Sequence, residues 1–82
     1  MSERARIAWR CRRGMKELDV LLEAYLQQHY DVASEEEQAS FERLLLMQDP
    51  DLHSYLSARD TPQDPSLISL IEKIRGSLRA GK

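Results

Sequence analysis

Long apolar runs are missing from this 82-residue sequence. No stretch approaches the ~18 apolar residues of a membrane-spanning helix, and the first residues lack the apolar segment of a secretory signal. The single cysteine excludes an internal disulfide and, by itself, a cysteine-based zinc site. Three glycines and three prolines argue against fibrous or low-complexity classes. We therefore expect a soluble domain without membrane insertion in a reducing compartment.

The chain length suits one small domain over residues 1–82, with a thin core and no deep cavity. The net charge of −2 is unevenly distributed: residues 1–16 hold six basic residues and one acidic residue, whereas residues 17–64 hold twelve acidic residues and two basic ones. This asymmetry indicates either a polar binding surface at one end or two halves that complement each other within the fold. Composition alone leaves both open.

Strand signals are weak, and the apolar residues recur at helical spacing. The periodicity predicts an all-α, compact bundle of about five short helices: residues 4–13, 15–30, 34–47, a short helix from 49 that carries Leu52, Tyr55 and Leu56, and a last helix from 65. Residues 57–64 are expected to form a polar loop, and residues 79–82 to fray. Gly14 either ends the first helix or lies within one long helix.

Three helix starts carry capping signals. Ser34 is predicted to cap a helix, with Glu37 three residues on completing a capping box. Asp49 is predicted as an N-cap followed by Pro50 at the first helical position, and Asp64 with Pro65 repeats that pattern.

Catalytic and metal sites have little support. Cys11 is four residues from Ile7, which places the thiol on the predicted core face rather than in a reactive setting, although arginines flank it. His29 and His53 fall on different predicted helices, so no metal-ligand cluster emerges. A glycine-rich phosphate loop is missing as well.

The segment 12–19 is the clearest candidate for a contact site, against the alternative of a helix corner with solvated charges. Gly14 would let a partner's backbone approach closely. Arg13 offers a planar donor fork for a carboxylate or phosphate, and Glu17, four residues on, is placed to orient it.

The stretch WRCRRGMKELD, residues 9–19, resembles the signature of the SdhE family, the FAD assembly factors of succinate dehydrogenase. The family hallmark Arg-Gly-x-x-Glu is matched by Arg13, Gly14 and Glu17. Further similar positions extend the resemblance over residues 5–57: Tyr30-Asp31, Phe41, Leu44-Leu45, Asp49-Pro50-Asp51-Leu52 and Tyr55-Leu56.

The resemblance implies a five-helix protein that is not an enzyme and holds no cofactor of its own. Such factors bind the flavoprotein subunit of succinate dehydrogenase, and in bacteria also that of fumarate reductase, and promote covalent attachment of FAD to a histidine of that subunit. Relatives in mitochondria carry targeting segments and none is obvious here, so a bacterial cytoplasmic protein, monomeric when free, is expected.

In this interpretation the partner surface comprises Arg13, Gly14 and Glu17 with Trp9, Met15 and Tyr30 as apolar anchors. Arg13 would pair with an acidic or carbonyl group of the flavoprotein, while Glu17 would fix Arg13 or meet a partner cation. Met15 and Tyr30 have core packing as an equal alternative. Two other functions stay open: an antitoxin-like interaction module, as described for some members, and a basic arm with Trp9 that binds nucleic acid.

Overall fold

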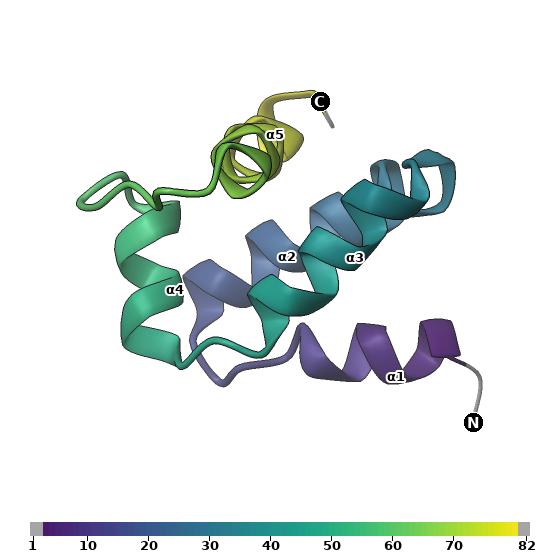
Figure 1. Ribbon diagram of the computed structural model, residues 1–82. Helices are drawn as coiled ribbons and strands as arrows, with labels where there is room; N and C mark the ends of the chain where they lie inside the picture. The colour runs from purple at the N-terminus through teal and green to yellow at the C-terminus, as the bar shows by residue number, and fades with distance from the viewer. Residues whose placement is uncertain (1–2, 81–82) are drawn as a thin grey trace.

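The computed structural model describes the backbone of residues 3–80 and the side chains of residues 4–77 (Figure 1). Within that part the chain is all-α and has no strand. Its elements are α1 (Glu3–Arg10), α2 (Lys16–Gln28), the short 3₁₀ helix η1 (Tyr30–Val32), α3 (Glu35–Leu45), α4 (Asp49–Leu56) and α5 (Pro65–Ala80). The predicted fold class is confirmed.

The helices assemble around α2 and α5. Helix α5 packs across α2 and α3 and also touches α4, while α1 lies on the side of the molecule away from α5 (Figure 1). Because none of these helices is long enough to be stable alone in water, the fold depends on their mutual packing.

One contiguous core joins all five helices. Tyr25 and Phe41 are fully buried at its centre, with ring centroids 4.6 Å apart. Most of the other core residues belong to the apolar helix faces predicted from the sequence. Cys11 is buried with Ile7 in this core, as predicted. Leu78 falls on the same predicted inner face of the last helix as Leu70, Ile71 and Ile74, but its side chain lies outside the described residues. The tail expected to fray from residue 79 is helical through Ala80, and residues 81–82 are likewise outside the described part.

The first two helices are separate, which settles the alternative left open at Gly14. Helix α1 stops at Arg10, three residues earlier than predicted, and residues 11–15 form an irregular link. Gly14 has φ = +82°, the left-handed region that favours glycine. Helix α2 also ends early, at Gln28, and the chain tightens into η1; α3 ends at Leu45 rather than near Met47.

Two of the capping predictions need correction. Ser34 accepts a hydrogen bond from the Glu37 amide (3.1 Å) and Asp64 from the Ser66 amide (2.9 Å), as expected of N-caps. Asp49, however, is the first residue of α4 and Gln48 its N-cap, because the Asp49 carboxylate bonds to Arg13 instead. The Glu37 carboxylate does not close a capping box, since it accepts from Tyr25 and Lys73.

Candidate protein-binding surface

Arg13 is the structural centre of the link between α1 and α2. Its guanidinium donates from Nε to Asp49 Oδ1 (2.9 Å) and from Nη1 to the carbonyls of Leu45 (2.7 Å) and Arg10 (3.2 Å). Nη2 donates to the carbonyl of Met47. The carbonyls at the end of a helix have no partner within the helix. One guanidinium therefore bonds to carbonyls at and just after the end of α3 and pairs with the carboxylate at the start of α4.

The predicted outward role of Arg13 is therefore not what its geometry shows. The Arg13 side chain is only 15% exposed, and most of its donors are used within the fold. The backbone of Arg13 is also held, because its amide donates to Asp19 Oδ1 at 2.6 Å. Sequence reasoning missed Asp19 and Asp49 as the acidic partners of Arg13; their only local signal was a position at the start of a predicted helix.

Gly14 and its neighbours form the open side of this link, which we call the Gly14 corner (residues 13–17). A methyl group built on Gly14 would have no atom within 4 Å apart from those of Gly14 itself and its two chain neighbours. Met15 is 36% exposed and makes no side-chain cap for α2, so the surface alternative describes it better than the core one. The corner thus offers bare backbone with an apolar side chain beside it.

Glu17 points away from Arg13, contrary to the expectation that it would orient the guanidinium. Its side chain is 83% exposed, and its Oε2 lies 3.4 Å from His53 Nε2 on α4. The link curves away from helical geometry between the two residues, so the four-residue spacing does not bring them together. Glu17 is consequently free to meet a partner group.

The two aromatic anchors proposed from the sequence have different environments. Trp9 is 71% exposed on α1, which suits a contact role. Tyr30 is 7% exposed, its ring packs 5.7 Å from that of Phe41, and its hydroxyl lies 3.4 Å from Glu42 Oε2. The packing alternative is the one that the geometry of Tyr30 favours.

Cys11 has the environment of a packing residue. It is fully buried, and burial together with the nearby Glu23 carboxylate raises the pKa of its thiol to about 12. Since only the thiolate is a good nucleophile, the flanking arginines do not make this cysteine reactive.

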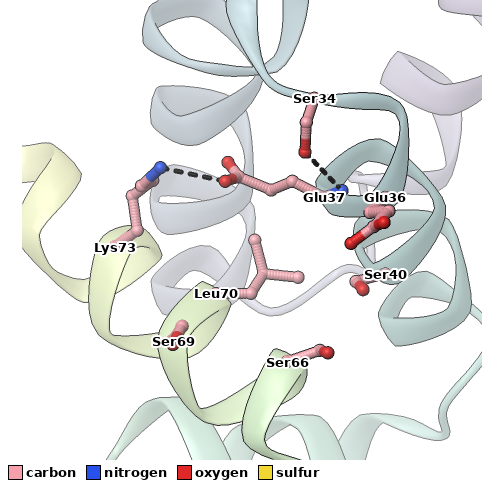
Figure 2. A pocket seen from close by; sticks show the side chains of 8 residues that line it. All are labelled: Ser34, Glu36, Glu37, Ser40, Ser66, Ser69, Leu70 and Lys73. Carbon is pink, nitrogen blue, oxygen red and sulfur yellow. Dashed lines mark hydrogen bonds and ion pairs between the residues drawn. The ribbon is translucent and has the colours of Figure 1, made fainter.

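A separate hollow of about 200 Å³ lies between the start of α3 and α5 (Figure 2). Lys73 donates to Glu37 Oε1 across it at 2.9 Å, and the buried Tyr25 hydroxyl donates to the other oxygen of Glu37. Burial opposes ionisation of Glu37, but these two hydrogen bonds outweigh it and lower its pKa from the ordinary 4.5. The network ties α2, α3 and α5 together and gives each oxygen of Glu37 a hydrogen-bond donor.

Two further features bear on function. The described residues contain no group of three or more histidine, cysteine or acidic side chains placed to hold a metal ion. None of the helices within residues 3–80 has the length and apolar character that a membrane span requires.

Comparison with known proteins agrees with the resemblance seen at residues 9–19. A family model described as flavinator of succinate dehydrogenase matches residues 5–77. The FAD assembly factor SdhE of Methylococcus capsulatus is 47% identical over 75 residues, which span 92% of this chain and 90% of that protein. The FAD assembly factor SdhE of Yersinia pseudotuberculosis is 39% identical over 80 residues, spanning 98% of this chain and 91% of that protein. With its all-α fold and a match over nearly its whole length, this chain belongs to the family of succinate dehydrogenase flavinators, the SdhE FAD assembly factors.

Proposed function

We propose that this protein binds the flavoprotein subunit of succinate dehydrogenase through the Gly14 corner and promotes covalent attachment of FAD to a histidine of that subunit. Family membership supports the flavinylation role. The observation that supports this site is the open backbone at Gly14, held rigidly from behind by the hydrogen bonds of Arg13.

Rigidity of the corner favours binding. A loop that is ordered before it meets a partner loses less conformational entropy on association than a flexible one. The Arg13 guanidinium bonds to Asp49 and the Arg13 amide bonds to Asp19, so the backbone next to Gly14 is held from two sides. Arg13 thereby contributes to binding indirectly, by holding the surface that the partner meets.

Glu17 supplies the charged contact of this surface. Its exposed carboxylate, with His53 as a weak neighbour, is available to a basic side chain or a backbone amide of the flavoprotein. A pair of this kind excludes water once the complex forms and fixes the relative orientation of the two proteins.

The contribution to flavinylation is positional. The bond joins the flavin to a histidine of the partner, and its formation needs the ring and the imidazole to be aligned. A protein that binds the aligned conformation better than the others raises its population without entering the chemistry. FAD would be held by the partner, because this chain has only three glycines and no glycine-rich phosphate loop. The factor would accordingly act as a non-enzymatic chaperone, monomeric when free.

The test is flavinylation of a succinate dehydrogenase flavoprotein subunit produced without its native factor. The subunit is incubated with FAD, with and without this protein, and denatured, and flavin fluorescence is read in its gel band. A wild-type protein that restores fluorescence supports the proposal. Equal fluorescence with and without it, in a subunit that needs a factor, overturns the proposal.

Matched variants locate the site. Gly14→Ala and Gly14→Arg both suffer the same strain at φ = +82°, and neither side chain meets an obstacle at its first atom, so only the size of the side chain differs. Fluorescence that is kept by Gly14→Ala and lost by Gly14→Arg places a partner against Gly14, whereas equal effects would assign Gly14 a purely structural role. Glu17→Ala should lower flavinylation while Glu72→Ala, an exposed acidic position on α5, should not.

A further inference from the structure

Leu46 is a large apolar side chain that the fold leaves in contact with solvent. It lies in the link between α3 and α4 and is 71% exposed, although it directly follows the buried Leu45. The family match assigns it no role, and the Gly14 corner does not include it. A single exposed leucine is common on soluble proteins, so its position in the fold decides whether it matters.

One side chain bonds the link around Leu46 to the Gly14 corner. Arg13, which belongs to the corner, donates from Nη1 to the carbonyl of Leu45 and from Nη2 to the carbonyl of Met47. These are the two residues on either side of Leu46. The α1–α2 link and the α3–α4 link accordingly cross each other in Figure 1. The surface at Leu46 is therefore continuous with the surface at Gly14.

The backbone of the α3–α4 link is held at several points. The carbonyls before and after Leu46 are bonded to Arg13, and the Leu46 amide donates to the carbonyl of Arg43 at 3.1 Å. The Arg13 side chain is only 15% exposed, so water has little access to these bonds. A side chain that is presented by an ordered backbone loses less conformational entropy on binding than one on a flexible loop. Leu46 thus offers a pre-ordered apolar contact.

The Gly14 corner is too small to bind a protein by itself. A stable interface involves about 20–30 residues on each side, and well-packed groups near its centre contribute most of the binding energy. The corner has five residues, and Met15 is its one exposed large apolar side chain. A partner that sits on Gly14 must therefore cover neighbouring surface as well, and Leu46 is the exposed apolar side chain that Arg13 joins to the corner.

Val32 provides an internal contrast to Leu46. It is 84% exposed, more than Leu46, but it precedes α3 whereas Leu46 follows α3. The 11 residues of α3 separate the two positions by about 16 Å along the helix axis. Exposure alone does not distinguish Leu46 from Val32, whereas the connection to the corner through Arg13 does.

We propose that Leu46 belongs to the surface that binds the flavoprotein subunit, and that an apolar side chain of that subunit packs on it while the same protein covers Gly14. The inference rests on the proposed function, because the partner is the same. It extends the binding surface from the α1–α2 link across Arg13 to the α3–α4 link. Two segments that lie far apart in the sequence then form one contact.

Photocrosslinking tests this contact directly. The photoreactive residue p-benzoylphenylalanine replaces Leu46 in one preparation and Val32 in another, and each is irradiated with the purified flavoprotein subunit. A crosslink to the subunit from position 46, and none from position 32, supports the inference. Three results would each overturn it: no crosslink from position 46 in a mixture where calorimetry shows binding, equal crosslinking from position 32, or capture of only a second copy of this chain.

Matched substitutions test the chemistry of the contact. Leu46→Gln makes the side chain polar at similar length and should weaken binding about tenfold in calorimetry, because the burial of an apolar side chain is lost. Leu46→Met keeps an apolar side chain of similar volume and should bind like wild type. Val32→Gln makes the same polar change at the other end of α3 and should leave the affinity unchanged. Circular dichroism of each variant checks that the fold is intact.

The outcomes separate the two proposals. Stimulation of flavinylation by wild type, together with a Leu46→Gln variant that binds as tightly as wild type, retains the proposed function and refutes the Leu46 contact. A crosslink from position 46 without any stimulation of flavinylation retains the contact and refutes the role in flavin attachment. Absence of both binding and stimulation by wild type removes both proposals.

Discussion

Replacing Arg13 by alanine should destabilise the fold rather than only weaken a contact. The variant loses four hydrogen bonds and leaves the carbonyls of Arg10, Leu45 and Met47 and the Asp49 carboxylate without the guanidinium. Asp49 is 37% exposed, so water can replace that partner, and the same holds for the longer bond to Arg10. The cost then rests on the carbonyls of Leu45 and Met47.

The magnitude follows from those two bonds. Hydrogen bonds from a charged donor contribute about 1.5–3 kcal/mol each, which gives a loss of about 3 kcal/mol at the lower end. A chain of 82 residues has a free energy of unfolding of about 4–12 kcal/mol. Arg13→Ala should therefore remove a large share of the stability of this protein.

Urea denaturation followed by circular dichroism at 222 nm measures the effect. Arg13→Lys keeps the positive charge near Asp49 but cannot reach all the carbonyls at once, so about half of the loss should return. Arg12→Ala is the matched control, because that neighbouring arginine is 75% exposed and its removal should cost under ~0.5 kcal/mol. A loss below about 1 kcal/mol for Arg13→Ala would refute the assignment of Arg13 to the fold.

Two other predictions concern ionisable groups, the half-buried Glu37 and the buried Cys11. Because the pKa of Glu37 is lowered in the folded state, its ionisation contributes stability that is present above about pH 4.5 and is lost as the pH falls through the folded pKa. The free energy of unfolding of Glu37→Gln should therefore fall less between pH 5 and pH 3 than that of wild type, as measured by urea titration at each pH. The exposed Glu36→Gln is the control and should behave like wild type. A fall in Glu37→Gln as large as that of wild type would contradict this prediction. Cys11, buried with a thiol pKa of about 12, should react with a disulfide reagent at pH 8 only after denaturation, and labelling of the native protein at the rate of a free thiol would show that its burial is wrong.

Much of the fold was readable from local patterns. The apolar stripe of residues 18–26 predicted a helix whose Leu18, Leu22 and Leu26 face the core, and Ser34 was recognised as an N-cap from its hydroxyl and the acidic residues after it. Both signals act over three or four residues, a distance that helix geometry fixes. The end of α1 was predicted less accurately, because the arginine-rich residues before Gly14 are compatible with a helix as well as with an irregular link.

The candidate site could be located from the sequence, but the direction of its side chains could not. The sequence singled out the Gly14 corner, and its resemblance to the SdhE family indicated that residues 13–17 matter. Whether each residue points outward was beyond local reasoning: Arg13 and Glu17 are four apart, yet one is enclosed by the fold and the other is 83% exposed. Tyr30 was left open between anchor and core, and packing against Phe41 favours the core.

The sequence by itself determined the helices, their inward faces and the family, and it left open whether the chain breaks at Gly14. Only the tertiary structure decided what the charged side chains do. Arg13 bonds to residues 32–36 positions away, because the end of α3 exposes carbonyls that its own helix cannot satisfy and the packing of α1 brings a guanidinium within reach. Glu37 likewise bonds to Tyr25 and Lys73 instead of capping α3 locally. A long side chain can bond to any partner that packing brings near it, whereas sequence spacing shows only the partners that are close along the chain.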